Sequence, residues 1–336
     1  MTGSPSISVV IPTFNRKDRL LECLRSLEAQ TYPRADFDVC VVDDGSSDGT
    51  AEAVGSFASR TQIRVRFAGR PHEGPSAARN AGVDATGGDV IAFTEDDITL
   101  DPQWLEHAAR YFLDPGTAVV EGRTRLAGSE TLRSFERAGQ PGFLPCNLFV
   151  RRGAFVAAGG FDPAYSDLSR NLYFREDADF GFRLLRKGYT AVYAPDVVVT
   201  HPAQFLTPGD VLRHVRRYLF DPLLYRNHPA QYRQYIEVKR LGPLVVHRPF
   251  HYLSWFYLAG FILILSVIFS HHDAYVPAVL VMLLLLHIGI RYRYERRDVP
   301  AFWNIPATAV YLFLPFYYFA WFLRGCLRFK SWRALL

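Results

Sequence analysis

Apolar runs and helical patterns alternate along the first 205 residues of the chain. Short runs rich in valine and isoleucine recur, and between them leucine repeats at the three- and four-residue spacing of an amphipathic helix. This alternation predicts an α/β fold, in which a mostly parallel sheet carries helices on both faces. The expected strands are residues 7–11, 39–42, 63–67, 90–94, 118–121, 147–150 and 197–200, and the expected helices include 20–27, 76–85 and 178–187.

The pattern changes in the last third of the chain. Three apolar, aromatic-rich segments at about 252–270, 274–290 and 302–323 are each close to the length of a helix that crosses a bilayer. Before them, residues 208–220 combine apolar and basic positions in the way of an amphipathic helix at a membrane surface. The predicted parts are a globular domain at 1–205, interfacial helices at 206–250 and a transmembrane region at 251–336.

The basic residues set the expected membrane topology. The arginine-rich loop 291–297 should lie in the cytosol by the positive-inside rule, and no signal-peptide pattern precedes the first strand. We therefore expect a multi-pass protein of the plasma or inner membrane with a cytosolic globular domain. Pro306 and Pro315 leave two forms of the third apolar segment open, a crossing helix and a kinked or re-entrant one.

Composition argues against several other classes of protein. The formal net charge is only +5 over 336 residues, so the basic residues mixed with tyrosines at 225–240 favour a membrane surface over a nucleic acid. The four cysteines show no pair spacing, which is typical of reduced structural thiols. Because the chain has neither a P-loop nor a dinucleotide-binding fingerprint, ATP and nicotinamide chemistry are disfavoured.

Polar clusters follow three of the predicted strands. They read Pro-Thr-Phe-Asn-Arg at 12–16, Asp-Asp-Gly-Ser-Ser-Asp-Gly at 43–49 and Glu-Asp-Asp at 95–97. In an open α/β sheet, ligands bind beyond the carboxyl ends of the strands. The three clusters are therefore expected to form one site.

The acidic cluster at 95–97 is the most informative of the three. Neighbouring carboxylates repel one another, and a cation between them removes the cost. Oxygen ligands suit Mg²⁺ or Mn²⁺, which proteins bind through one or two carboxylates together with the phosphates of a substrate. A divalent-cation site for a diphosphate is one interpretation, and an N-cap for a helix starting near Pro102 is the other.

With these clusters in order, the chain resembles a family 2 glycosyltransferase with the GT-A fold over about its first 200 residues. Further matching pieces are Ala-Arg-Asn-Ala-Gly at 78–82, Gly-Gly-Phe-Asp at 159–162 and Arg-Glu-Asp at 175–177. Each motif is short, but their order and spacing together are specific. The resemblance implies a Rossmann-like catalytic domain that binds a nucleotide-diphosphate sugar and a divalent cation.

The resemblance also implies roles for single residues on the donor side. Thr13 and Asp44 are expected at the nucleotide base, Arg79 at the base or the diphosphate, and Asp96 near the ribose. The full set of implied donor-binding residues is Pro12, Thr13, Arg16, Asp44, Arg79 and Asp96.

Three residues are implied as ligands of Mg²⁺ or Mn²⁺. Asp97 is the expected main ligand. Glu95 stands where relatives have aspartate, and its extra methylene is compatible with coordination through a water. His201 follows the last predicted strand and is either a further ligand or a structural histidine.

Asp177 is the expected catalytic base, and Glu176 is expected to position the acceptor. Sugar transfer with inversion needs a group that accepts the proton of the attacking hydroxyl. The competing interpretation makes Asp177 only the N-cap of the helix at 178–187, where the helix macrodipole favours a carboxylate.

Three hypotheses follow from the sequence. The first is a membrane-attached, inverting glycosyltransferase that acts on a hydroxyl of a lipid-linked or cell-envelope glycan acceptor. The second is a polyprenyl-phosphate sugar synthase, whose phosphate acceptor is already anionic near neutral pH and needs no base. The third is a membrane scaffold that keeps the fold without catalysis.

Overall fold

A computed structural model describes residues 4–127, 142–202, 207–236, 238–241, 244–247 and 304–335, together with residues 255, 259–260, 262 and 266. The chain divides into two compact units, Met1–Ala203 and Gln204–Leu336. The predicted acidic, donor-binding and acceptor residues all belong to the first unit.

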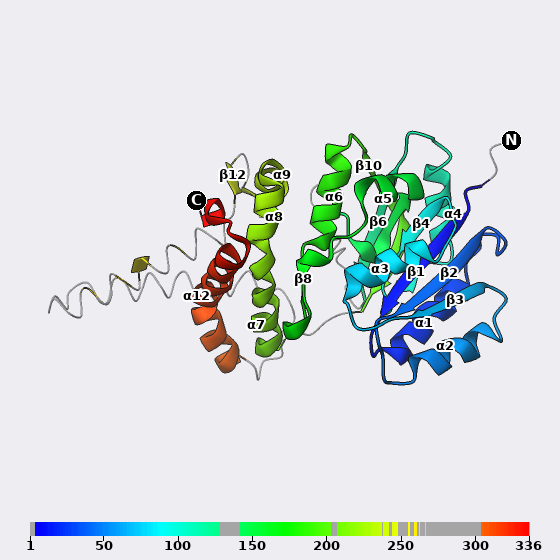
Figure 1. The fold of residues 1–336 in the computed structure, drawn as a ribbon, viewed down its shortest axis with the longest axis horizontal. Coiled ribbons are helices and arrows are strands. Elements are labelled where there is room, and N and C mark those ends of the chain that lie inside the picture. Colours follow the sequence, from blue (N-terminus) through cyan, green and yellow to red (C-terminus); the bar gives the residue numbers. More distant parts are fainter. Residues whose placement is uncertain are drawn as a thin grey trace. The chain divides into compact units, whose positions relative to one another are not determined.

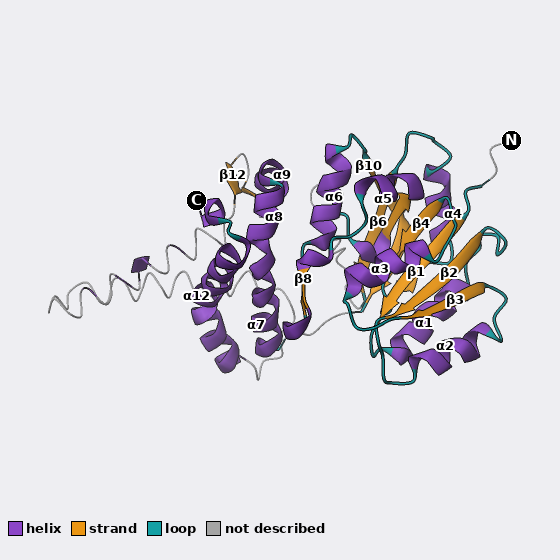
Figure 2. Cartoon of the chain, viewed as in Figure 1, coloured by secondary structure: helices purple, strands orange, loops and turns teal. Residues whose placement is uncertain are grey.

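The first unit is built on a mixed, mostly parallel sheet (Figures 1 and 2). Its described strands run in the order β3-β2-β1-β4-β7-β6-β10-β5. The pairs β1 with β2, β1 with β4, β2 with β3 and β6 with β10 are parallel, whereas β7 is antiparallel to both of its neighbours and β5 to β10. The bounds are β1 Ile7–Thr13, β2 Phe37–Asp43, β3 Arg64–Gly69, β4 Val90–Phe93, β5 Thr99–Leu100, β6 Val119–Leu126, β7 Leu148–Arg151 and β10 Ala191–His201.

Helices cover both faces of this sheet, so its central strands are buried on both sides. Along β1, Val9 and Ile11 join one apolar cluster and Val10 joins the other, as the period of two in a strand requires. The first cluster takes side chains from α1 (Lys17–Glu28), α2 (Thr50–Ala58) and α4 (Trp104–Tyr111). The second takes them from α3 (Pro75–Asp84), α5 (Arg152–Ala158) and α6 (Glu176–Arg186).

Gly82 lets α3 lie directly on β1. A β-carbon on Gly82 would come within 2.4 Å of Val10 Cγ1 and 3.0 Å of Val42 Cγ2. A side chain at this position would therefore push the helix away from the sheet. Because α3 carries Arg79, this close approach also fixes where that guanidinium reaches the edge of the sheet.

Short elements join the larger ones in the first unit. The hairpin of β8 (Ser166–Asp167) and β9 (Leu172–Tyr173) lies just before α6 in the chain. The 3-10 turns are η1 Pro145–Asn147, η2 Pro163–Tyr165 and η3 Leu168–Arg170.

The second unit is mainly helical in its described part. The helix predicted at 208–220 is observed as α7 (Pro208–Arg216) followed by the 3-10 turn η4 (Arg217–Phe220). A capping box between Thr207 and Asp210 starts α7, and Val211, Val215 and Leu219 are buried. The remaining bounds are α8 Asp221–Asn227, α9 Pro229–Tyr235, β11 Val238–Leu241, β12 Leu244–His247, α12 Asn304–Phe329 and η7 Trp332–Leu335.

The helix α12 packs along α7, η4 and α8 inside this unit. The ring of Tyr318 meets that of Tyr218, with centroids 4.8 Å apart, and Gly325 lies against the carbonyl oxygen of Leu219. The third predicted apolar segment overlaps α12, which contains Pro315 without ending there. The first two apolar segments lie outside the described residues except at a few positions.

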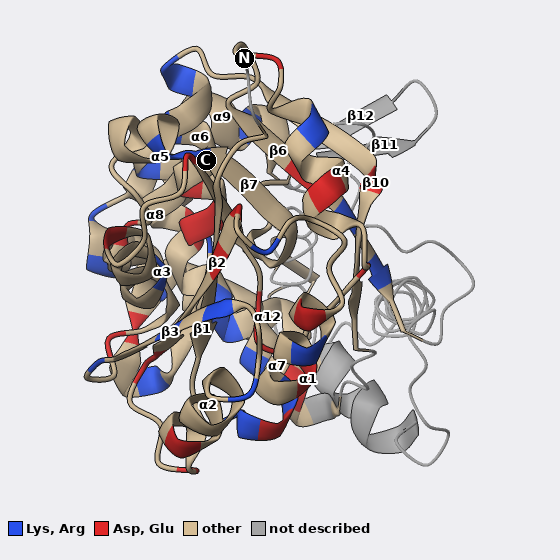
Figure 3. Cartoon of the chain, turned by 90° about the vertical axis from the view of Figure 1, so that its right-hand side faces the viewer, with Lys and Arg blue, Asp and Glu red and all other residues tan. Residues whose placement is uncertain are grey.

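The transmembrane prediction finds no counterpart among the described helices. None of the helices in the described part of the chain is both long and apolar enough to span a bilayer. Figure 3 shows basic and acidic residues both distributed along the described part of the chain.

Candidate active site

The site begins where the loops after β1 and β2 are fastened together. The amide of Asn15 donates to Ser46 Oγ at 2.8 Å, and Asn15 Oδ1 accepts from the amide of Ser47 at 2.8 Å. Asn15 has a φ of 53°, a left-handed conformation that asparagine tolerates better than most residues. The two polar clusters at 12–16 and 43–49 therefore meet at one edge of the sheet, as predicted.

The acidic triplet after β4 lies against the first of these loops. Thr13 Oγ1 donates to Asp96 Oδ2 at 2.8 Å, and Arg16 Nη1 lies 3.1 Å from Asp96 Oδ1. Burial raises the pKa of Asp96, and the charge of Arg16 and the bond from Thr13 oppose that rise. For Arg16, burial lowers the pKa, but the charges of Asp96 and Asp97 outweigh it and the pKa is raised.

The N-cap interpretation of the triplet is wrong. The helix after it, α4, begins at Trp104, and its N-cap residue is Gln103, whose side chain makes no capping bond. The triplet lies in the turn between β4 and β5 instead. None of its carboxylates therefore serves as the N-cap of α4.

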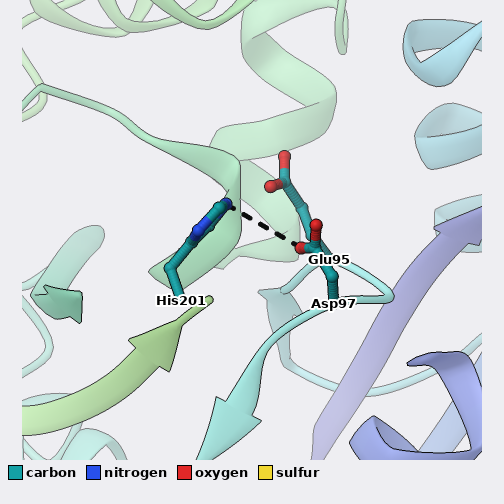
Figure 4. Close-up of side chains that lie close together, drawn as sticks. All are labelled: Glu95, Asp97 and His201. Atoms are coloured by element: carbon teal, nitrogen blue, oxygen red, sulfur yellow. Dashed lines mark ion pairs between the residues drawn. The ribbon is translucent and has the colours of Figure 1, made fainter. Parts of the chain in front are cut away.

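Glu95, Asp97 and His201 come together as a possible metal site (Figure 4). Each offers one ligand atom, and these atoms lie within 4.8 Å of one another. Asp97 Oδ1 is buried and has no hydrogen-bond partner, and His201 Nε2 lies 3.9 Å from it. A buried carboxylate oxygen without a partner is costly, so the residues present fit a divalent cation.

The second nitrogen of His201 supports this assignment. His201 Nδ1 lies 2.8 Å from the carbonyl oxygen of Pro202, which can only accept a hydrogen bond. The proton therefore resides on Nδ1, and Nε2 keeps the lone pair that faces Asp97. Metal-binding histidines are commonly oriented in this way by a bond from their other nitrogen.

Asp44 is buried and makes its contacts within the chain. It accepts bonds from the amides of Glu73 at 2.8 Å and Gly74 at 2.9 Å, and its Oδ2 lies 2.8 Å from His72 Nδ1. The carboxylate thus holds the loop that leads into α3. Its predicted contact with the nucleotide base stays a prediction.

Two aromatic side chains extend the site next to Asp44. The half-exposed ring of Phe14 stacks on His72, with centroids 4.2 Å apart and planes 23° apart. His72 Nε2 lies 3.2 Å from the hydroxyl of Tyr173 on β9. The loop of Asp44 is therefore linked to the hairpin that precedes α6. The sequence offered no signal for His72 or Tyr173, because the contact joins residues 101 positions apart.

Arg79 connects the acidic triplet with the start of α6. Its guanidinium is buried and reaches Glu95 Oε1 at 3.1 Å and Glu176 Oε1 at 3.4 Å. It also lies over the ring of Phe161, 5.5 Å from the centroid. The predicted contact of Arg79 with the base or diphosphate stays untested, and in the structure the residue bridges two acids.

Glu176 and Asp177 form the first turn of α6. The N-cap residue is Arg175, whose φ of 76° is unusual outside glycine, so the interpretation of Asp177 as the N-cap is wrong. Asp177 Oδ1 accepts a bond from the amide of Ala178 at 2.7 Å. Burial first, and then the charge of Asp177, raise the pKa of Glu176, whereas Arg79 lowers it.

Sequence reasoning missed Glu121, a buried carboxylate on β6. It accepts bonds from the amides of Phe143 at 2.9 Å and Leu144 at 3.4 Å. Burial raises its pKa to about 7, and the charge of Asp177 adds to the rise. An acid at the end of the apolar run 118–121 was the available signal.

Most of the predicted site residues meet at one edge of the sheet. Pro12 lies within β1, directly before Thr13. Several predicted site residues contact one another through a hydrogen bond, an ion pair or the possible metal site. They are Thr13, Arg16, Arg79, Glu95, Asp96, Asp97, Glu176 and His201.

Two family models match the chain. The model described as glycosyl transferase family 2 matches residues 8–161, and the model described as glycosyl transferase family group 2 matches residues 90–323. Together they cover the sheet, the acidic triplet and the start of α6.

Three curated relatives each match slightly more than half of the chain. Glycosyltransferase AglE of Haloferax volcanii is 29% identical over 213 residues, which is 60% of this chain and 68% of AglE. The pre-mycofactocin glycosyltransferase of Mycobacterium tuberculosis is 31% identical over 215 residues, 58% of this chain and 42% of that protein. The succinoglycan biosynthesis protein ExoM of Rhizobium meliloti is 29% identical over 210 residues, 58% of this chain and 66% of ExoM.

A solved structure supports the fold. The mannosyltransferase PcManGT from Pyrobaculum calidifontis, solved with GDP-Man and Mn²⁺, superimposes with a TM-score of 0.54 at 18% identity. The match covers 99% of this chain and 88% of that one. The mixed, mostly parallel sheet of the first unit is therefore GT-A-like, which confirms the predicted fold of this part of the chain.

Proposed function

Since the chain belongs to glycosyltransferase family 2, we propose that this nucleotide-sugar enzyme transfers its sugar, with inversion, to a hydroxyl group of a lipid-linked or cell-envelope glycan. One observation supports this proposal more strongly than any other. The buried, unpartnered oxygen of Asp97 faces Glu95 and His201, and Arg79 links this group to the helix that bears Asp177.

The donor half of the site consists of the edge of β1, the acidic triplet and the loop before α3. Thr13 and Arg16 fix the carboxylate of Asp96 next to Asp97, and Phe14 offers a half-exposed ring beside Asp44. We assign the nucleotide to this half. A GT-A structure with GDP-Man and Mn²⁺ bound supports the pairing of a sugar nucleotide with a divalent cation here.

Glu95, Asp97 and His201 would hold the cation, Mg²⁺ or Mn²⁺. When bound, such an ion stabilises the negative charge that develops on the leaving diphosphate. Two contacts within the chain orient the ligands of the cation. The Nδ1 proton of His201 is directed at the carbonyl oxygen of Pro202, and an ion pair with Arg16 holds Asp97.

The acceptor half is the start of α6. Asp177 would take the proton of the acceptor hydroxyl while that oxygen bonds to the anomeric carbon and the bond from that carbon to the diphosphate oxygen breaks. Attack from the face opposite the diphosphate inverts the configuration. Glu176, held by Arg79, would orient the acceptor next to this base.

The membrane location and the envelope acceptor belong to the same proposal. The apolar segments at 252–270 and 274–290 and the basic, amphipathic α7 support attachment to a membrane with the catalytic unit in the cytosol. The similarity to ExoM, a succinoglycan biosynthesis protein, supports a polysaccharide acceptor. A sugar synthase that uses a polyprenyl phosphate is the second candidate, favoured by the same apolar segments.

Replacing Asp177 by Asn separates these candidates. With a hydroxyl acceptor, the variant should lose about 100- to 10,000-fold in kcat, because no base takes the proton. Mn²⁺ affinity should be unchanged, since Asp177 is outside the cation group. Turnover close to that of the wild type would favour the phosphate acceptor. The scaffold hypothesis would return if the wild type bound no nucleotide in the presence of Mn²⁺.

A further inference from the structure

The guanidinium groups of Arg16, the N-cap residue of α1, and of Arg19 approach the same carboxylate that faces the cation site. Arg16 Nη1 lies 3.2 Å from Asp97 Oδ2, and Arg19 Nη1 lies 3.4 Å from the same oxygen. The other oxygen, Oδ1, is the buried atom without a hydrogen-bond partner. One oxygen of Asp97 thus meets positive charge, and the other has no hydrogen-bond partner.

Arg19 stands where the helix itself disfavours a cation. It belongs to the first turn of α1, which starts at Lys17, and it follows Asp18. The macrodipole of a helix makes positive charge unfavourable at this end. Asp18 in the same turn and Asp97 beside Arg19 compensate for this arrangement.

The exposure of the two partners differs widely. The side chain of Arg19 is 55% exposed, whereas that of Asp97 is 3% exposed. A half-exposed guanidinium can leave an ion pair at little cost, because such pairs contribute little in water. The buried carboxylate cannot move with it.

From these contacts we propose that Arg19 makes cation binding depend on the donor's diphosphate; this inference rests on the proposed function. In the free enzyme, the guanidinium neutralises Asp97 and weakens the attraction for a divalent cation at Oδ1. An incoming diphosphate draws Arg19 away, and Asp97 then presents its full charge to the cation. By thermodynamic linkage, the cation strengthens diphosphate binding by the same factor.

Arg19 has two conceivable roles at Asp97: it holds the carboxylate in place, or it competes with the cation for it. If Arg19 only held Asp97 in place, its removal would weaken Mn²⁺ binding. If Arg19 competes with the cation, its removal strengthens Mn²⁺ binding in the absence of nucleotide. The two roles therefore predict changes of opposite sign.

The test measures Mn²⁺ binding to the full-length protein by electron paramagnetic resonance, with and without GDP or UDP. Arg19→Met should bind Mn²⁺ alone about threefold more tightly than the wild type, and a nucleoside diphosphate should enhance Mn²⁺ binding less in the variant. Arg19→Lys keeps the charge and should behave as the wild type. Arg25→Met, on the exposed last turn of the same helix, controls for a general change of charge.

The outcomes separate this inference from the proposed function. Unchanged or weaker Mn²⁺ binding by Arg19→Met, in a wild type that binds Mn²⁺, would overturn the inference and leave the cation site intact. Tighter binding by both Arg19→Met and Arg25→Met would also overturn it, because the effect would then come from net charge. Absence of Mn²⁺ binding in the wild type and every variant would overturn the cation site itself, and the inference with it.

Discussion

The two halves of the site surround their carboxylates in different ways. On the cation side, Asp96 and Asp97 meet the half-exposed guanidinium groups of α1 at 3.1 to 3.4 Å. On the acceptor side, Glu121 is held by backbone amides, and Glu176 meets one buried guanidinium that it shares with Glu95.

In the proposed function, carboxylates therefore serve two different purposes in this site, cation binding on one side and proton transfer on the other. Burial raises the pKa of Asp96, but on this side the charge of Arg16 and the bond from Thr13 oppose the rise. Burial also raises the pKa values of Glu121 and Glu176, and on the acceptor side the charge of Asp177 adds to the rise. Raised pKa values suit groups that lie where a proton is transferred near neutral pH. Arg79 is the contact between the two halves.

Replacing Arg79 by Met should have the largest effect on stability. The change leaves the partly buried carboxylates of Glu176 and Glu95 without their shared guanidinium, so we expect a loss of about 3 kcal/mol in the free energy of unfolding at pH 8. Chemical denaturation followed by circular dichroism measures this. The loss should be smaller at pH 5, where Glu176 can take a proton. Arg25→Met is the surface control, expected within about 0.5 kcal/mol of the wild type; equal stability of the two variants would refute the role of Arg79.

Glu121→Gln tests the acceptor side through pH. The folded protein raises the pKa of Glu121 from 4.5 to about 7, so the folded form binds this proton more tightly than the unfolded form does. The contribution of Glu121 to stability is therefore fully present below pH 4.5 and is lost as the pH rises through about 7. Its size is at most about 3 kcal/mol.

The measurement compares unfolding free energies of the wild type and Glu121→Gln between pH 5 and pH 8. The wild type should gain stability relative to the variant as the pH falls. Glu22→Gln, an exposed site on α1, supplies the control and should show a flat difference. A flat difference for Glu121→Gln as well would contradict the raised pKa.

His201→Ala should have the smallest of these effects. Glu95 and Asp97 remain as ligands, so we expect about tenfold weaker Mn²⁺ binding, measured by calorimetry. His107 is a matched control, because its Nδ1 also lies 2.7 Å from a backbone carbonyl, that of Asp196. An unchanged Mn²⁺ affinity in His201→Ala would assign His201 to the structural role.

The larger elements of the first unit follow from its hydrophobic pattern. Every strand predicted from an apolar run overlaps an observed strand. The central strands are buried on both faces and read as continuous apolar segments, whereas the edge strand β3 is largely exposed. The two-residue strands β5, β8 and β9 were not predicted, since two residues cannot show a period. The antiparallel insertion of β7 between β4 and β6 also depends on distant pairing that no local pattern records.

The residues of the site also divide into those that a local sequence pattern predicts and those that it does not. Asp96 and Asp97 could be predicted because their position after a strand fixes the edge of the sheet that they reach. Arg19 could not, because its contact with Asp97 joins residues 78 positions apart along the chain. Glu121 ends an apolar run and was overlooked, because its bonds from the amides of Phe143 and Leu144 leave no local pattern. Both N-cap interpretations were wrong because each helix begins within one turn of the expected start, at a different residue. The N-cap residue of α4 is Gln103, and that of α6 is Arg175.

The central claim is that Glu95, Asp97 and His201 hold a divalent cation beside a sugar nucleotide. Crystals grown with Mn²⁺ and a nucleoside diphosphate, measured at the manganese absorption edge, test it most directly. We expect one strong anomalous peak about 2.2 Å from Asp97 Oδ1, with diphosphate density next to it. A peak at another position, with Asp97 Oδ1 still without a ligand while the nucleotide is bound, would contradict a cation site at these three residues.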